Sequence, residues 1–204
     1  MSSEAYEENN KVPKFIRVIY ELLEVVIPAF VIVVFINIFM FRQTEVHQTS
    51  MTNTLQEGDR VIILPLVPSY DELKIGDIIV SHPSNFEEPI IKRLIAKEGQ
   101  TVDVRAGIVY VDDEMLSEPY IRNYKGIGTY TPVYNILSEI YEDLKTEDLM
   151  QFPLTVPEQC VFAMGDNRLG SVDSRYKKVG FIKREDIIGK AALRIFPFNK
   201  FGLL

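Results

Sequence analysis

Short runs rich in isoleucine and valine recur along most of the chain and predict a domain built mainly from β-strands. Apolar and polar residues alternate within several of these runs, and glycine-containing turns such as Glu57-Gly58-Asp59 and Lys97-Glu98-Gly99 separate them. The runs cover residues 60–64, 77–80, 90–96, 101–104, 108–111, 160–163 and 187–195. Many short strands joined by such turns predict a mainly β fold, either a sandwich or a partly open barrel.

One segment departs from this pattern and has helical spacing. Between Thr131 and Lys145 the apolar residues recur at the intervals of one helix face. Thr131 can cap such a helix, and Pro132 suits its first turn. We therefore expect residues 113–155 to form an excursion from the sheet that carries one amphipathic helix. The pattern favours a helix that covers an edge of the core, and a contact with a membrane surface or a partner is the alternative.

The longest apolar run lies near the N-terminus and predicts a single transmembrane helix. Residues 25–41 include no charged side chain. With the preceding turn, about 20 residues rising about 1.5 Å each cover roughly 30 Å, the thickness of the hydrocarbon layer. A buried core helix is disfavoured because the run is apolar on all sides, and a cleaved signal peptide because no small-residue cleavage site follows. We expect a tail over residues 1–21, an anchor over residues 22–42 and a soluble domain over residues 43–204.

The basic residues beside this run predict its orientation. Lys11, Lys14 and Arg17 precede the run, whereas only Arg42 follows it closely. Basic residues are retained on the cytoplasmic side of a membrane. We therefore expect a single-pass protein of the cell membrane, with a cytoplasmic N-terminus and an extracytoplasmic domain.

Composition excludes several classes of function. The 204 residues include 22 Lys and Arg against 29 Asp and Glu, a net charge of −7 at pH 7. This balance offers no basic surface for phosphates, so we expect no nucleic-acid partner. The single cysteine, Cys160, cannot form an intramolecular disulfide, and with only His47 and His82 beside it a Cys/His metal site is excluded. We expect no metal and no cofactor.

Two residues could supply a nucleophile and a general base. Ser50 follows the apolar run in a segment rich in hydroxyl residues, and a nucleophile there would need a base within hydrogen-bonding reach. His47 or His82 could pair with it, although by itself Ser50 is more simply explained as a turn hydroxyl. Lys92 lies in the apolar run 90–96, and burial there would lower its pKa enough to make it a general base. The alternative is an edge-strand lysine whose amine reaches water.

A third polar cluster, Gly165 to Arg175, predicts an irregular loop. It is dense in short polar side chains, and Asp173 could pair with Arg175 or Arg93 to fix its shape. Loops held in this way often position catalytic groups. A rigid surface turn would explain the cluster equally well if it stood alone.

Together these clusters resemble the type I signal peptidase family of membrane-anchored Ser-Lys proteases. The segments that carry the resemblance occur in the family's order: S-M-x-P-T-L at residues 50–55, G-D-I-V-V at 76–80, K-R-x-x-x-x-x-G-D at 92–100, V-Y-V-N-G-x-x-L-x-E-P-Y at 109–120, and G-D-N-R-x-x-S-x-D-S-R at 165–175. The last of these matches at every specified position. The chain differs from the pattern at Asn53, which replaces a proline that would fix the turn, and at Gln48, where some relatives have a hydroxyl residue.

The resemblance implies a membrane-bound serine endopeptidase that removes signal peptides from exported preproteins. Its β-rich catalytic domain would lie against membrane lipids, near the secretion translocon. Ser50 would be the nucleophile, and neutral Lys92 would take its proton. The Ser50 backbone N–H would contribute to the oxyanion hole.

The same match implies supporting and substrate-binding positions. Ser171 would orient the lysine, while Asp173, with Arg93 or Arg175, would hold the loop. The residues that would line shallow pockets for small substrate side chains are Val46, Met51, Leu55 and Ile91.

Two alternatives from other classes stay open. A catalytically silent membrane-anchored β-domain could bind exported chains, and the substitutions at Asn53 and Gln48 favour this reading. A self-cleaving Ser-Lys regulator of the related repressor type would need an N-terminal DNA-binding module, where this chain has the apolar run instead.

Overall fold

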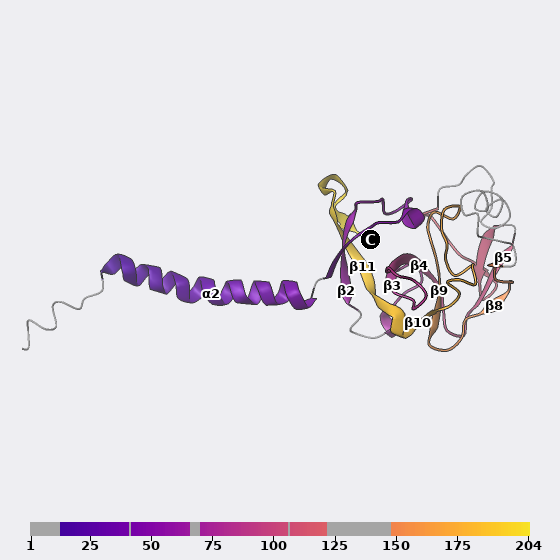
Figure 1. Ribbon diagram of the computed structural model, residues 1–204, viewed down its shortest axis with the longest axis horizontal. Helices are drawn as coiled ribbons and strands as arrows, with labels where there is room; N and C mark the ends of the chain where they lie inside the picture. Colours follow the sequence, from indigo (N-terminus) through magenta and orange to yellow (C-terminus); the bar gives the residue numbers. More distant parts are fainter. Residues whose placement is uncertain (1–12, 41, 66–69, 106, 122–147) are drawn as a thin grey trace, which may run out of the picture. The chain divides into compact units, whose positions relative to one another are not determined.

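The chain forms two compact units, Met1–Phe41 and Arg42–Leu204 (Figure 1). The first contains a helix, and the second is built mainly from β-strands. The computed structural model describes residues 13–40, 42–65, 70–105, 107–121 and 148–204.

Helix α2, Lys14–Met40, forms where the apolar run predicts a helix and begins earlier than the run. Its described apolar side chains are exposed, and Pro28 lies inside it. Among the described residues, no helix is both long and apolar enough to cross a membrane. Charged residues, including Glu21 and Glu24, interrupt the first turns of α2. The transmembrane span expected over residues 22–42 is therefore not supported by the structure.

The larger sheet of the second unit is antiparallel throughout the residues that the structure describes. Its strands follow the order β1-β2-β11-β3-β4-β9-β10, and β12 pairs with β11. Their bounds are β1 Arg42–Glu45, β2 Arg60–Pro65, β3 Ile78–Ser81, β4 Ile90–Lys97, β9 Cys160–Met164, β10 Ile182–Lys183, β11 Ile187–Phe196 and β12 Gly202–Leu203. Short 3₁₀ helices connect them: η2 Thr49–Met51, η3 Tyr70–Glu72, η5 Arg184–Asp186 and η6 Phe198–Lys200.

A smaller sheet in the order β7-β6-β5-β8 completes the described part of this unit. Its strands are β5 Thr101–Arg105, β6 Ile108–Val111, β7 Glu114–Met115 and β8 Leu154–Thr155. Asp112 and Asp113 make the turn between β6 and β7 with positive φ values of 52° and 64°. Aspartate tolerates this left-handed conformation better than most residues, so the pair can replace the Asn-Gly turn of the family pattern.

The strands predicted from the sequence are confirmed with boundaries that differ by at most a residue or two. All of the predicted runs correspond to strands β2, β3, β4, β5, β6, β9 and β11. The mainly β fold is therefore as expected. The amphipathic helix predicted between residues 131 and 145 lies outside the described residues.

Strand β4 lies at the centre of the larger sheet and sets the position of the site. It pairs with β3 on one side and with β9 on the other. Every residue from Ile90 to Ala96 is buried, and its apolar residues belong to three separate core clusters. Lys92 is therefore an interior residue, and the alternative of an edge-strand lysine that reaches water is wrong.

Candidate functional site

Ser50 lies in a tight turn that apolar side chains hold in the core. The turn is helix η2, which follows β1, and the Leu55 N–H donates to the Met51 carbonyl at 2.6 Å. Met51 and Leu55 are completely buried, while Ser50 keeps 6% of its surface exposed. The serine is thus fixed by its neighbours, and it still lines a cleft at the surface.

The Ser50 hydroxyl meets the amine of Lys92. Lys92 Nζ lies 2.8 Å from Ser50 Oγ, although the residues are 42 positions apart in sequence. Ser50 Oγ is also 3.4 Å from the Ile91 carbonyl oxygen. No histidine is among the described partners of this hydroxyl: His47 is exposed, and His82 Nε2 lies 3.1 Å from the Phe86 carbonyl oxygen. The Ser-His pairing considered from the sequence is therefore wrong.

Burial prepares the lysine to act as a base. Lys92 is only 1% exposed, and this desolvation lowers its pKa from 10.5 to about 8. The negative charge of Asp173 opposes the shift, and the positive charge of Arg175 adds to it. A neutral amine near pH 8 within hydrogen-bonding distance of a serine hydroxyl can remove the hydroxyl proton. Among the described residues, no group of three or more His, Cys, Asp or Glu side chains could hold a metal ion.

The loop from Gly165 to Arg175 is organised by a buried ion pair. Arg175 Nε and Nη2 donate to the two carboxylate oxygens of Asp173 at 2.8 and 2.9 Å. The Gly165 N–H also donates to Asp173, at 2.9 Å. Burial alone would raise the pKa of Asp173, but the adjacent Arg175 lowers it below the usual range, so the carboxylate stays ionised. Of the two pairings considered for Asp173, the structure contains the one with Arg175.

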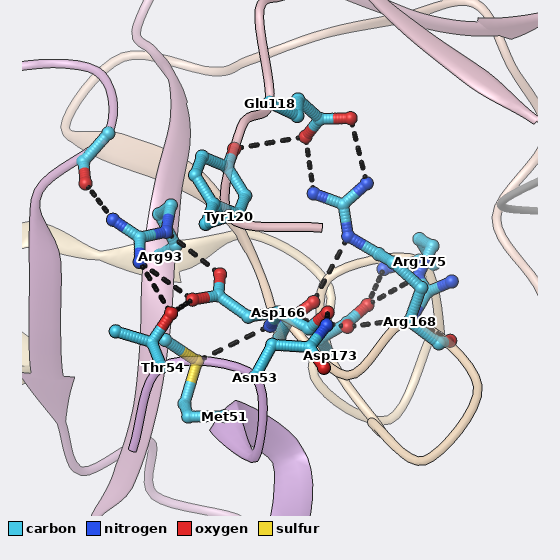
Figure 2. A network of polar contacts seen from close by, with 12 residues as sticks. Met51, Asn53, Thr54, Arg93, Glu118, Tyr120, Asp166, Arg168, Asp173 and Arg175 are labelled. Carbon is cyan, nitrogen blue, oxygen red and sulfur yellow. Dashed lines mark hydrogen bonds and ion pairs between the residues drawn. The ribbon is translucent and has the colours of Figure 1, made fainter. Parts of the chain in front are cut away.

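Arg93 has a different partner, Asp166, which the sequence did not single out. Arg93 Nε and Nη2 contact the Asp166 carboxylate at 2.8 and 2.6 Å, and Nη1 donates to the Gly76 carbonyl at 2.6 Å (Figure 2). The Arg93 guanidinium also lies 4.0 Å from the centre of the Tyr120 ring. This pair links strand β4 to the start of the 165–175 loop.

A second missed pair, between Arg168 and Glu118, extends the network (Figure 2). The Arg168 guanidinium is bidentate on the Glu118 carboxylate, and its Nε donates to the Gly165 carbonyl at 3.0 Å. The Tyr120 hydroxyl donates to Glu118 at 3.0 Å. Buried arginine–carboxylate pairs hold two planar groups in a fixed orientation. The segment around Glu118 therefore stabilises the loop from outside.

Polar contacts fasten the serine turn to residues 166 and 167. The Asn167 N–H donates to the Ser50 carbonyl at 2.9 Å, and the Asn53 side-chain amide donates to the Asp166 carbonyl at 2.8 Å. The Thr54 hydroxyl donates to the Asp166 carboxylate. Asn53 thus makes a cross-loop hydrogen bond where the family pattern has a proline ring.

Gly165 and Ser171 pack closely against the backbone of the serine turn. A Cβ atom on Gly165 would lie 2.2 Å from Ser171 Oγ and 2.5 Å from the Ser50 carbonyl oxygen. Ser171 is fully buried, and its hydroxyl has no hydrogen bond of normal geometry among the described residues. Ser171 therefore lies beside the serine turn, but the predicted orientation of Lys92 by Ser171 does not take the form of a direct hydrogen bond.

A cleft of about 300 Å³ opens beside the Ser50 hydroxyl. Val46, Met51 and Ile91 line it, as the resemblance implies. Leu55 does not line the cleft but packs below these residues in the same core cluster. The other residues around the cleft are Thr44, Glu45, His47, Gln48, Val80, Glu88 and Pro89.

Replacement of Asn53 by aspartate should lower kcat for any reaction at Ser50, with little change in KM. The variant keeps the shape of the side chain, but it loses the donor and places a carboxylate against the Asp166 carbonyl. We expect a loss of about 10-fold in kcat, because a small displacement of a catalytic group costs much of its rate. Steady-state kinetics and thermal unfolding measure the two effects.

The matched control is Asn85→Asp. Asn85 also donates its side-chain amide to a backbone carbonyl. Its partner carbonyl, that of Lys178, borders a cavity that Ser50 and Lys92 also line, so a second control, Asn199→Asp, makes the same change at an exposed residue that lines neither cavity beside Ser50. An equal fall in kcat in Asn53→Asp and in both controls would contradict a positioning role for Asn53.

Comparison with known proteins shows that this chain is similar to one group of enzymes. The model of the family described as "Signal peptidase, peptidase S26" matches residues 19–196. A protein named probable signal peptidase I-1 from Synechocystis sp. is 32% identical over 97% of this chain and 92% of its own length. Signal peptidase I of Bacillus caldolyticus is 33% identical over 84% of this chain and 88% of its own length. The crystal structure of a signal peptidase I from Enterococcus faecalis is 29% identical, covers 60% of this chain and 98% of that chain, and has a TM-score of 0.40.

Proposed function

The chain belongs to the signal peptidase family, peptidase S26, and from this premise we propose that Ser50 and Lys92 form its catalytic pair. The enzyme is an endopeptidase that removes signal peptides from preproteins. The observation that carries the proposal is the contact of 2.8 Å between Lys92 Nζ and Ser50 Oγ inside the core. Burial of an ammonium is unfavourable, so a lysine in this position favours a role for its neutral amine.

In the proposed acylation step, neutral Lys92 accepts the proton of Ser50 as Oγ attacks the carbonyl carbon of the scissile bond. The Ser50 backbone N–H donates to the oxygen that gains negative charge. Protonated Lys92 then gives its proton to the leaving amine as the C–N bond breaks. This leaves the signal peptide as an ester on Ser50 and releases the mature protein.

Deacylation repeats the same proton transfers with water. Neutral Lys92 takes a proton from a water molecule, whose oxygen attacks the ester carbonyl. The ester bond breaks, the proton returns to Ser50 Oγ, and the signal peptide leaves with a free carboxylate. One lysine thus serves as base and acid in both halves of the reaction.

The supporting residues act in this scheme by fixing the pair. Asp173 with Arg175, and Arg93 with Asp166, hold the loop and strand that flank Lys92. Ser171 completes the buried packing behind the serine turn. Val46, Met51 and Ile91 would contact small substrate side chains in the cleft, and Leu55 would support them from below.

Cleavage of a preprotein by the purified protein in detergent tests this proposal. We expect the wild type to release the signal peptide and Ser50→Ala to lose at least about 10³-fold in kcat while unfolding normally. The matched control is Thr49→Ala, which removes the hydroxyl of the exposed neighbour and should keep its activity.

Two results would refute the proposal. Full activity in Ser50→Ala would exclude the serine as nucleophile. Binding of preproteins by the wild type without any cleavage would favour the silent binding domain instead.

We propose also that residues 22–42 anchor the enzyme in the cell membrane, with the N-terminus in the cytoplasm and the β-rich domain outside, next to lipids and near the secretion translocon. The support is the uncharged run over residues 25–41, the exposed apolar side chains of α2 and the basic residues before it. The full chain should stay with membranes during alkaline extraction, and external protease should digest the domain in spheroplasts. Release into the supernatant would contradict the anchor, and protection from protease would contradict the orientation.

A further inference from the structure

A second cavity, with a volume of about 630 Å³, also opens at Ser50, and it is larger than the cleft of about 300 Å³ described above. Gln48 and Ser50 line both spaces, so a peptide bound at Ser50 can reach into each of them. Lys92 borders the second cavity and is not among the described residues around the cleft. The two spaces therefore differ in their access to the base.

The position of Lys92 indicates which part of a substrate each space receives. In the proposed acylation step, protonated Lys92 gives its proton to the leaving amine, so this nitrogen must come within hydrogen-bonding distance of Lys92 Nζ. The nitrogen belongs to the first residue of the mature protein. This requirement favours the second cavity for the first residue of the mature protein, and it leaves the cleft for the residues before the scissile bond.

One wall of the second cavity is apolar and is part of the core. Phe86, Ile90 and Val172 line the cavity. Ile90 belongs to a buried core cluster, and Phe86 and Val172 pack against the same cluster. The Lys178 ammonium lies 5.6 Å from the centre of the Phe86 ring. A wall that is already packed in this way stabilises a bound apolar side chain without having to form first.

The charges around the second cavity do not favour a charged substrate residue. Besides Lys92, its described lining includes one charged side chain of each sign, Lys178 and Asp148. An acidic or basic substrate side chain would meet one favourable and one unfavourable charge, and it would lose part of its hydration. Gly170 adds no side chain to the lining, which leaves room for a large residue.

We propose that the second cavity selects preproteins whose mature part begins with a large apolar residue, and that the Phe86 ring determines this selection. The inference rests on the proposed function, because the cavity is assigned from the proton that Lys92 returns to the leaving amine. The residue after the scissile bond then contributes to the choice of preprotein, in addition to the small residues before it.

Peptides that differ only in the residue after the scissile bond test the selection. The full-length protein in detergent is given substrates with alanine, leucine, phenylalanine or aspartate at this position and alanine before it. We expect kcat/KM for the leucine and phenylalanine peptides to exceed that for the alanine peptide about 10-fold, a discrimination within the range of an apolar pocket. The aspartate peptide should be cleaved no better than the alanine peptide.

Two outcomes separate this inference from the proposed function. Cleavage of all four peptides with equal kcat/KM, or best cleavage of the alanine or aspartate peptide, would overturn the selection and leave the proposed function intact. No cleavage of any peptide would refute the proposed function and this inference with it.

Phe86→Ala tests the residue assigned to the selection. We expect the ratio of kcat/KM between the leucine and alanine peptides to fall from about 10 to within about twofold of unity. The ratio is independent of the fraction of folded enzyme, so partial unfolding of the variant does not affect it. Phe181→Ala is the matched control, because Phe181 is also half-buried, packs against another core cluster and lines neither space. A wild-type ratio in Phe86→Ala, or an equal fall in both variants, would overturn the role of Phe86.

Discussion

Replacement of Lys92 by methionine should abolish cleavage and, at the same time, raise the free energy of unfolding at pH 7. Methionine keeps an unbranched chain in the buried site but cannot accept a proton, so kcat should fall at least about 10³-fold. The folded-state pKa of Lys92, about 8, lies below the usual 10.5. At pH 7 the folded protein therefore holds an ammonium in a site that disfavours its charge. At 1.36 kcal/mol per pKa unit, removal of this charge should stabilise the fold by up to about 3 kcal/mol.

The lowered pKa of Lys92 also sets how stability and activity should change with pH. Between about pH 8 and pH 10.5 the unfolded chain binds the Lys92 proton while the folded chain does not, so the stability of the wild type should increase with pH across this window. Lys92→Met should lack this contribution. For activity, kcat/KM of the wild type should rise about tenfold per pH unit below pH 8 and level off above it, as neutral lysine accumulates.

Urea unfolding and preprotein cleavage, each measured across the pH range, check both effects. Lys97→Met is the matched control, because Lys97 ends the same strand and its Nζ contacts the Asp71 carbonyl and the Tyr70 ring, away from Ser50. The control should stay within about 0.5 kcal/mol of the wild type and remain active. A flat pH profile of kcat/KM, or a Lys92→Met protein less stable than the wild type at pH 7, would argue against a desolvated lysine base.

Gly165→Ala should disable the enzyme through packing alone. The added Cβ would lie 2.2 Å from Ser171 Oγ and 2.5 Å from the Ser50 carbonyl oxygen, well inside van der Waals contact. The Ser50 carbonyl belongs to the backbone of the serine turn, so relief of the overlap must shift that turn or the 165–175 loop and disturb the contact of Ser50 with Lys92. We expect a loss of about 2–4 kcal/mol in stability and of at least about 10²-fold in kcat.

Two further variants separate this packing effect from a general cost of alanine. Gly202→Ala adds the same methyl group where no atom lies within 4 Å, and should be nearly neutral in thermal unfolding and in detergent activity. Ser171→Ala on the Gly165→Ala background removes the hydroxyl overlap but leaves the Ser50 carbonyl in place, so activity should not return. Wild-type kcat in Gly165→Ala would show that the turn tolerates displacement.

The strands could be predicted from the sequence where local signals were strong. Runs of isoleucine and valine bounded by glycine turns marked β4 and its neighbours, because alternation and turn chemistry are properties of a few adjacent residues. Strands β1, β7, β8, β10 and β12 were missed. Each is short, has little β pattern of its own and becomes a strand by pairing with a longer neighbour: β2, β6, β5, β9 and β11 respectively.

The proposed nucleophile and base of the candidate site could be predicted from the sequence, whereas the ion pairs that hold them in place could not. Sequence motifs marked Ser50 and the 165–175 loop, and an apolar run marked Lys92 as buried. Asp166, by contrast, resembled an ordinary turn residue. Its partner, Arg93, is 73 positions away, and a buried ion pair over that separation leaves no periodic trace in the sequence. The pairing of Arg168 with Glu118, 50 positions away, escaped notice for the same reason.

The hydrogen bonds that join the serine turn to residues 166 and 167 also bear on when the site can form during synthesis of the chain. Ser50 and Lys92 are synthesised long before the loop that holds them, because Asp166 and Asn167 lie 74 and 75 positions after Lys92. Strand β9, which completes the pairing of β4, is made immediately before that loop. A nascent chain that ends before this point has both reacting groups but lacks the contacts that hold them together. We therefore expect protease activity only after the 165–175 loop has been synthesised.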